Sequence, residues 1–379
     1  MAVTWSRSDL GTAGAGTIFL AGKGEVSYKE MGISGDFLLT RSALQGTREL
    51  VLHLAAMKWA MGTIRALVQF RIPDLLAESA KTADELAVSV DADPSRLYRV
   101  LRAAATAGVL REDTSGHFSL APAADGLRAD SDDSLRDVLL FMTDPMMWRP
   151  YENVRHTVMT GESAFENSFG KPFYDYLRDH HDSSDVFDRA MAQNDSPETF
   201  ELFRDVDFSK YRRIADIGGG RGRFLAEILR HYLECFGAVC DHPLALSGAE
   251  EEFSQRGVAD RATAIKTDFF EKIPEGFDAY IIKRSLQNWG DTDAIRLLTK
   301  VREAIGGDLE ARLMIVNHVL TEPGTPDFGK LSDIEMMTVL GGGRERERAE
   351  WNRLAADSGF LIVSEPSPGK MSLLIFRPT

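Results

Sequence analysis

The carboxyl-terminal half of this chain of 379 residues alternates short apolar runs with amphipathic segments. The amphipathic segments, such as FLAEILRHYL and TDAIRLLTKVREAI, have the apolar spacing of helices. Strands that alternate with helices form a parallel sheet with helices on both faces. We therefore predict an α/β fold whose strands are RIADI, FGAVCD, ATAIKTD, FDAYIIKRSL and ARLMIVNHVL.

Two further apolar runs, GFLIVSEP and MSLLIFRP, close the sequence and are joined by the short turn SPGK. Such a short connection pairs strands antiparallel, because a parallel pair needs a crossover of roughly a dozen residues or more. The parallel sheet is therefore predicted to end in an antiparallel hairpin.

The residues before this half are predicted to be mostly helical. Residues 47–70 carry an apolar stripe at helical spacing, which another helix or a partner subunit could cover. Two short helices are predicted to begin at Thr82 and at Asp93, and Gly108 is a stop signal. A hairpin, VLREDTSGHFSL, follows. Two helices and a hairpin in this order predict a winged helix.

Winged helices often bind DNA, but here the arginines of the second helix are flanked by acidic residues. We interpret this module as a dimerisation domain or a substrate lid. The predicted parts of the chain are an N-terminal extension (1–47), the winged-helix domain (48–134), a helical connector that forms the substrate pocket (135–204) and the α/β domain (205–379).

Charge and composition exclude several classes of protein. The chain has 44 Lys and Arg against 58 Asp and Glu, a formal net charge of -14, which disfavours nucleic acids and anionic membranes. No uninterrupted apolar run approaches the roughly 20 residues of a membrane span. Cys235 and Cys240 lack the spacing of a disulfide framework or a metal site. Without a signal-peptide pattern, the protein is expected in the cytoplasm, with no metal, nucleic acid or membrane as partner.

A glycine-rich segment, DIGGGRG, lies between the first predicted strand of the α/β half and the helix after it. Glycine allows close approach of the backbone to a ligand, and a helix N-terminus offers free N–H groups. Dinucleotide binding is disfavoured, because Arg223 or Leu225 stands where the third glycine of G-x-G-x-x-G belongs. Asp241 ends the second strand and is suited to hold ribose hydroxyls. A ligand with ribose but no pyrophosphate is implied.

Together with Asp241 and Pro243, four segments (DIGGGRG, TDFFE, IIKRSLQNW and GGGRERERAEW) resemble the successive motifs of the S-adenosylmethionine-dependent O-methyltransferases. The similar subgroup contains plant phenolic enzymes and bacterial enzymes that tailor polyketides and antibiotics. The resemblance covers about residues 48–379. It implies a Rossmann-like class I methyltransferase domain over 205–379 and a winged-helix domain, over 48–134, that forms a homodimer.

The resemblance also implies roles for single residues. Gly218 and Gly220 would lie against the methionine part of S-adenosyl-L-methionine, and Asp241 would bind its ribose. The adenine would lie between Asp268 and Phe269. Lys283 would sit on the same face of the cofactor.

The chain departs from the family where many members have a histidine general base. That position is Gln287, and glutamine does not titrate near neutral pH, so it cannot accept the proton. The family's partner acid in the next strand is replaced by Asn317, which leaves Glu345 as the one acid at a catalytic position. Glu345 could also belong to a solvated helix start. His242 and His318 remain weak candidates for a base, since strand alternation turns His318 away from Asn317.

These residues lead to three hypotheses. The first is a methyltransferase that acts on an aromatic or polyketide-like natural product by proximity and orientation, on oxygen, nitrogen or carbon. Its acceptor would be oriented by Gln287, Asn288 and Glu345, in a pocket lined by Trp148, Phe187, Met191 and Asn194. The second is a family member that keeps the cofactor but does not methylate, such as a hydroxylase or cyclase. The third is a winged-helix regulator that senses a metabolite.

Overall fold

The computed structural model describes residues 46–131, 133–193 and 197–379. The predicted N-terminal extension, 1–47, lies outside the described residues except for its last two positions. Asn194, which was predicted to line the substrate pocket, also lies outside them.

The carboxyl-terminal half folds around one sheet with the strand order β10-β11-β8-β7-β4-β5-β6. The strands from β4 to β8 run parallel, and β11 pairs antiparallel with both β8 and β10, which confirms the predicted hairpin. A short strand, β9, was not predicted and pairs with β8. The bounds are β4 (Arg213–Ile217), β5 (Phe236–Asp241), β6 (Ala262–Lys266), β7 (Ala279–Lys283), β8 (Arg312–Leu320), β9 (Arg346–Glu347), β10 (Phe360–Ile362) and β11 (Lys370–Pro378).

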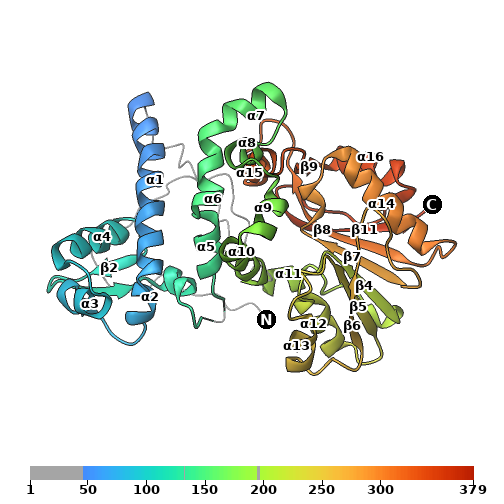
Figure 1. The fold of residues 1–379 in the computed structure, drawn as a ribbon, viewed down its shortest axis with the longest axis horizontal. Helices are drawn as coiled ribbons and strands as arrows, with labels where there is room; N and C mark the ends of the chain where they lie inside the picture. The colour runs from blue at the N-terminus through green and yellow to red at the C-terminus, as the bar shows by residue number, and fades with distance from the viewer. Residues whose placement is uncertain (1–45, 132, 194–196) are drawn as a thin grey trace, which may run out of the picture. The chain divides into compact units, whose positions relative to one another are not determined.

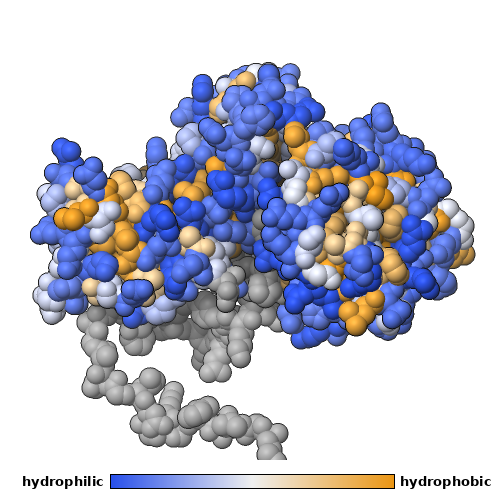
Figure 2. Space-filling view, turned by 60° about the horizontal axis from the view of Figure 1, so that its bottom comes forward, coloured by the Kyte–Doolittle hydropathy of each residue, from blue (hydrophilic) through white to orange (hydrophobic). Residues whose placement is uncertain are grey.

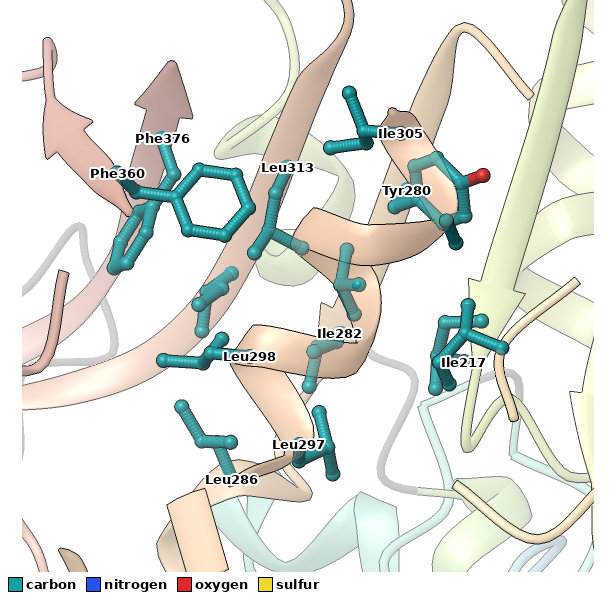
Figure 3. Packing of buried hydrophobic residues seen from close by; sticks show 14 of the residues in the cluster. Ile217, Tyr280, Ile282, Leu286, Leu297, Leu298, Ile305, Leu313, Phe360 and Phe376 are labelled. Carbon is teal, nitrogen blue, oxygen red and sulfur yellow. The ribbon is translucent and has the colours of Figure 1, made fainter. Parts of the chain in front are cut away.

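Helices cover both faces of this sheet (Figure 1), as the alternation of strands and helices predicts. One face packs against α12 (Arg223–His231) and α13 (Ala249–Gln255), and the other against α14 (Asp291–Ile305) and α16 (Arg348–Asp357). Figure 3 shows the core on the face covered by α14 and α16, where Leu297 and Leu298 of α14 lie among side chains of the sheet such as Ile282 and Leu313. Each large apolar side chain that is buried here contributes about 1.5–3 kcal/mol. The strand ends are therefore rigidly placed.

The predicted winged helix is present. It comprises α1 (Thr47–Gln69), α2 (Ile72–Leu75), α3 (Ala83–Val90), α4 (Pro94–Thr106) and a small sheet of β1 (Lys81–Thr82), β2 (Leu110–Glu112) and β3 (His117–Leu120). Thr82 caps α3 in a capping box with Glu85, and the Asp93 carboxylate accepts the Arg96 N–H at the start of α4. Both helix starts are those predicted from the sequence.

The long helix α1 leaves Leu50, Val51, Leu52, Leu54 and Trp59 exposed, and only Leu67 and Val68 are buried. Its 23 residues have a mean hydropathy of 1.2 in one window, so by length and composition α1 could cross a membrane. One such helix is weak evidence for a membrane span, and Lys58 and Arg65 divide this one into short apolar stretches, so the absence of a membrane span stays a prediction. Arg65 is tied to the protein, since its guanidinium donates to the Leu140 carbonyl at 2.7 Å. Exposed hydrophobic residues also form patches among hydrophilic ones on the face drawn in Figure 2.

The connector is helical, as predicted, and is built around aromatic side chains. Its core joins Phe141, Phe165, Phe173 and Leu177, with Phe187 packed against them. The elements are η2 (Pro122–Leu127), α5 (Arg136–Met142), α6 (Pro145–Trp148), η3 (Arg149–Asn153), α7 (Val154–Thr160), α8 (Ala164–Phe169), α9 (Phe173–Asp179), α10 (His181–Gln193), α11 (Pro197–Glu201) and η4 (Phe208–Lys210). Two elements of the later sequence, η5 (Leu286–Asn288) and α15 (Gly329–Leu340), complete the fold.

Candidate functional site

The glycine-rich segment forms a tight turn between β4 and α12. Gly218, Gly220 and Gly222 have φ values of 74°, 57° and 76°, a region that side chains other than glycine rarely occupy. The Gly218 N–H donates to the Cys240 carbonyl at 2.8 Å and fixes the turn to the end of β5. A Cβ on Gly222 would lie 2.6 Å from the ring of Phe253. The turn is thus set by backbone geometry that these glycines alone permit.

Asp241 lies beside this turn, at the end of β5. Its carboxylate accepts the Gly220 N–H at 2.9 Å through Oδ2 and the His242 N–H at 2.6 Å through Oδ1. Burial raises the pKa of Asp241 above its usual value, although the two N–H donors oppose this shift. A carboxylate can accept about four hydrogen bonds. Two acceptor positions therefore remain for the neighbouring hydroxyls of a ribose.

The three other predicted cofactor residues lie at the carboxyl ends of two strands of the sheet: Asp268 and Phe269 follow β6, and Lys283 ends β7. Phe269 is half-buried, and its Cζ lies 4.0 Å from the place of a Cβ on Gly218. Asp268 is exposed and accepts the N–H of Phe270 at 2.9 Å, so part of its carboxylate caps its own turn. Lys283 ends β7 and places its Nζ 5.6 Å from the ring centroid of Phe224. The Phe269 ring therefore lies beside the glycine turn.

The residues around the turn fit an adenosyl sulfonium. Backbone at Gly218 and Gly220 can approach a ligand closely, since these positions carry no side chain. Asp241 offers the carboxylate acceptors that a ribose needs, and the Phe269 ring offers a surface on which adenine can stack. The negative charge of Asp241 also favours a cation nearby.

The short helix η5, which follows β7, holds the predicted acceptor residues Gln287 and Asn288. Gln287 is buried, and its Nε2 donates to the Arg284 carbonyl at 2.8 Å. Its Oε1 is buried and accepts no hydrogen bond from the part of the chain that the structure describes. Asn288 Nδ2 donates to the hydroxyl of Tyr174, on α9, at 2.7 Å. The connector and the strand end therefore meet at Asn288.

Glu345 and Asn317 form a buried pair, in which Asn317 lies within β8 and Glu345 just before β9. Glu345 Oε2 accepts the Asn317 Nδ2 donor at 2.9 Å, and Oε1 accepts the Ser332 hydroxyl at 3.3 Å. Glu345 is 7% exposed, so the alternative interpretation as a solvated helix start is wrong. Burial raises the pKa of Glu345 to about 7, against the opposing positive charge of Arg284. A carboxyl group of this kind can exchange a proton near neutral pH.

The two weak candidates for a base are His242 and His318. Among the described residues, neither makes a hydrogen bond to Gln287. His318 faces away from Asn317, as strand alternation predicts, and its Nε2 lies 2.8 Å from Asp327 Oδ1. Asp327 also accepts the N–H groups of Thr321 and Gly329. This pair therefore fixes the loop that leads into α15. His242 is exposed and follows Asp241 at the start of a loop.

The predicted substrate residues are placed differently from one another. Phe187 is half-buried and packs edge-on against Tyr174, with ring centroids 6.3 Å apart. Phe187 therefore lies next to Tyr174, the residue that is hydrogen-bonded to Asn288. Trp148 and Met191 are 39% and 36% exposed. For these two, lining the pocket stays a prediction.

Two site residues were missed from the sequence. Tyr174 was not among the predicted site residues; although the whole residue is 38% exposed, desolvation of its hydroxyl and the negative charge of Asp241 both raise its pKa. Arg284 adopts a left-handed backbone with φ of 52°, and its charge acts on both Glu335 and Glu345. The sequence carries no signal for either feature, because both depend on contacts between distant segments.

Comparisons with known proteins agree with this geometry. Residues 52–129 match the model of an O-methyltransferase dimerisation domain, and residues 151–361 match that of an O-methyltransferase domain. The chain is 38% identical over 79% of its length, and 86% of the relative's, to 8-amino-8-demethylriboflavin N,N-dimethyltransferase of Streptomyces davaonensis. It is 33% identical to phenazine O-methyltransferase PhzM of Lysobacter antibioticus, covering 87% of this chain and 96% of the relative.

Among solved structures, the chain is similar to CalO1, a methyltransferase of calicheamicin biosynthesis, in its S-adenosylhomocysteine-bound form. The TM-score is 0.76 at 29% identity, covering 87% of this chain and 98% of that one. A relative of this kind holds the demethylated cofactor in the same fold. With both domain models matched in order, the chain belongs to the S-adenosylmethionine-dependent O-methyltransferase family and has the family's class I methyltransferase fold with an N-terminal dimerisation domain.

Proposed function

We propose that this protein methylates a small aromatic or polyketide-like natural product with S-adenosyl-L-methionine, by orientation rather than by a histidine base. The observation that carries this proposal is the position of Tyr174. Its hydroxyl is hydrogen-bonded to Asn288 and lies within the field of Asp241. Tyr174 is therefore bonded to the acceptor motif and lies close enough to the proposed ribose-binding acid to feel its charge.

The residues around the turn would hold the cofactor, which supplies a methyl group on a positively charged sulfur. Gly218 and Gly220 would cradle its methionine part, Asp241 its ribose, and Asp268 and Phe269 its adenine. Lys283 would lie on the same face of the cofactor. None of these residues takes part in bond making, so their role would be to fix the position of the cofactor and of its methyl group.

The acceptor residues would fix the position of the molecule that receives the methyl group. Asn288 is held in place by Tyr174, and Gln287 by its bond to the Arg284 carbonyl. The aromatic core around Phe187 offers an apolar wall against which a flat acceptor can pack. Holding two reactants at near-attack distance can lower a barrier by roughly 7–11 kcal/mol. This contribution does not depend on a base at position 287.

Glu345 is the remaining titratable group at a catalytic position. Its raised pKa, about 7, lets it take up a proton that the acceptor releases. Gln287 and Asn317 are neutral amides and can orient the acceptor but not deprotonate it. We therefore assign Glu345 the role of proton acceptor or positioning residue, and Gln287 and Asn288 that of positioning residues.

The proposal includes the assembly and the location of the protein. The exposed apolar side of α1 and the match to a dimerisation domain support a homodimer. The net charge of -14 supports a protein that binds neither nucleic acid nor anionic membranes. A cytoplasmic location is consistent with relatives that act in biosynthesis.

The test is product analysis with candidate aromatic acceptors and methyl-labelled cofactor. Formation of S-adenosylhomocysteine in step with a labelled product that is one methylene heavier supports the proposal. Turnover without S-adenosylhomocysteine would overturn it in favour of a hydroxylase or cyclase. Calorimetry supplies a second readout, since the protein stripped of ligand should bind S-adenosylhomocysteine.

A further inference from the structure

Arg346 is a charged side chain that the fold buries completely. It lies in β9 and is 0% exposed. Its guanidinium lies over the ring of Trp351, with Cζ 5.7 Å from the ring centroid. Removal of an ion from water is costly unless other groups bond it inside the protein. The groups that Arg346 bonds therefore indicate its role.

Arg346 donates to the segment that directly follows η5. Its Nη2 donates to the Trp289 carbonyl at 2.8 Å, and its Nε donates to Asp291 Oδ1 at 2.9 Å. Trp289 is the first residue after η5, and Asp291 is the first residue of α14. The guanidinium therefore holds the place where η5 leads into α14.

A second set of contacts joins the same two segments. The Arg344 N–H donates to the Gln287 carbonyl at 2.8 Å, and Arg344 Nη1 lies 3.1 Å from Asp291 Oδ2. A Cβ on Gly343 would lie 2.9 Å from the Gln287 carbonyl oxygen, so the two backbones are in close contact. The segment before β9 therefore lies directly against η5 and the start of α14.

Glu345 lies between these two arginines, but its carboxylate makes other contacts. Its Oε2 accepts the Asn317 Nδ2 donor at 2.9 Å, and its Oε1 accepts the Ser332 hydroxyl at 3.3 Å. Residues 343–346 therefore carry the acid at a catalytic position and are also bonded to η5 and the segment after it. The contacts of the two arginines thus set the position of Glu345 relative to the acceptor residues on η5.

We propose that Arg346 is a positioning residue for the methyl transfer, because its guanidinium fixes the distance between Glu345 and the acceptor helix η5. This inference rests on the proposed methyltransferase function and adds a residue to its site. The planar guanidinium of arginine binds two oxygens in fixed directions, which the single ammonium of lysine does not. A displacement of about 1 Å at a reacting group can slow a reaction roughly 100-fold. Arg346 should therefore affect turnover more than cofactor binding.

Arg346→Lys is the first variant, since it keeps the charge but cannot bond both the Trp289 carbonyl and Asp291. The assay uses methyl-labelled S-adenosyl-L-methionine, with 2-naphthol and 2-hydroxyanthraquinone as acceptor probes. We expect kcat to fall about 10- to 100-fold, while the KM for the cofactor changes by less than about twofold. Arg346→Met loses all of these hydrogen bonds and should lose more activity than Arg346→Lys. Full kcat in Arg346→Lys would overturn the inference.

A core variant on α14 separates positioning from general stability. Val301→Ala removes buried volume further along this helix, and urea unfolding is measured for it and for the Arg346 variants. At a similar loss of stability, Val301→Ala should keep the kcat of the wild type. If its kcat falls as far as that of Arg346→Lys, Arg346 acts through stability alone and the inference is wrong.

Asp291→Ala supplies the test from an exposed position if the Arg346 variants fail to fold. The Asp291 side chain is 47% exposed, and its removal takes an acceptor from both Arg344 and Arg346. Here kcat should fall about tenfold, the effect of one lost hydrogen bond between charged groups. Asp293→Ala is the matched control, because Asp293 is also exposed and lies in the same first turn of α14. Equal kcat in these two variants would overturn the inference.

Hydrogen exchange distinguishes this inference from the function on which it rests. With the full chain in S-adenosylhomocysteine, the amides of residues 286–291 should exchange about tenfold faster in Arg346→Lys, and those of the glycine turn at the wild-type rate. Unchanged exchange at 286–291 overturns the inference, whereas label transfer by the wild type keeps the methyltransferase function standing. A wild type that binds S-adenosylhomocysteine but labels neither probe leaves the exchange rates to decide. A wild type that neither binds S-adenosylhomocysteine nor transfers label overturns both.

Discussion

Asn288 Nδ2 donates a 2.7 Å hydrogen bond to the hydroxyl of Tyr174, although 114 positions of sequence separate the two residues. The bond joins the connector to the strand ends of the α/β domain. Tyr174 also lies within the field of Asp241 and packs against Phe187. Tyr174 thus lies between one proposed residue of each kind: Asp241 for the cofactor, Asn288 for the acceptor and Phe187 for the pocket.

Removal of the Tyr174 hydroxyl should impair acceptor positioning more than folding. In Tyr174→Phe the ring contacts remain and the bond to Asn288 is lost. We expect kcat/KM for the acceptor to fall about tenfold, which corresponds to roughly 1.4 kcal/mol, with little change in cofactor affinity. Tyr176→Phe, on the same helix, is the control, and an equal loss of activity in it would contradict this prediction. Steady-state kinetics and calorimetry provide the two readouts.

Asp241→Asn should weaken cofactor binding. The amide keeps an oxygen for the Gly220 N–H but loses the negative charge and one acceptor. Hydrogen bonds to charged groups contribute about 1.5–3 kcal/mol, so the dissociation constant for S-adenosylhomocysteine should rise roughly 10- to 100-fold. Asp260→Asn, at an exposed aspartate, is the matched control. Unchanged calorimetric affinity in Asp241→Asn would exclude Asp241 from the ribose site.

The stability of the protein should depend on the ionisation of Glu345. Its pKa rises from 4.5 in the unfolded chain to about 7 in the folded one, because the folded state disfavours the charged form. The stability that the neutral form provides is complete below pH 4.5 and is lost as the pH rises through 7. The loss amounts to about 3 kcal/mol at most, from a shift of some 2.5 pKa units.

Glu345→Gln tests this dependence, because glutamine does not titrate. Urea unfolding is measured for both proteins at pH 5 and at pH 8. The free energy of unfolding of the wild type, relative to the variant, should decrease between these two values. A difference that stays constant with pH would show that Glu345 is ionised at both.

Gln287→Ala should slow turnover modestly and leave the pH profile in place. The side chain orients the acceptor but has no proton to exchange, so the loss should be about tenfold. A drop of several orders of magnitude would reveal an essential role for Gln287. The pH dependence of kcat/KM is the decisive measurement, since a shifted profile would also contradict the assignment.

Gly222→Ala should destabilise the fold at the glycine turn. The position has φ of 76°, and a Cβ would lie 2.6 Å from Phe253. We expect a loss of at least about 1–3 kcal/mol, from backbone strain and the clash. Gly307→Ala is the control, because a Cβ there meets nothing within 4 Å. Thermal unfolding should separate the two variants, and equal midpoints would contradict the prediction.

Much of the fold could be predicted because its signals are local. The apolar runs of β4, β5, β6, β7 and β8 and the helix starts at Thr82 and Asp93 are properties of a few neighbouring residues. The turn between β4 and α12 is equally local, since glycine alone adopts its φ values without strain. The successive motifs of the family are short segments as well, so the cofactor and the family could be inferred from them.

The sequence by itself therefore determined the α/β architecture, the winged helix, the family and the cofactor, because each depends on the order of neighbouring residues. Only the tertiary structure decided that Tyr174 meets Asn288, that Glu345 is buried against Asn317, and that Arg346 is bonded to Asp291. These contacts join segments 28 to 114 positions apart. The physical reason is that burial, and with it the raised pKa of Glu345, arises when distant segments together exclude water, which no local pattern encodes.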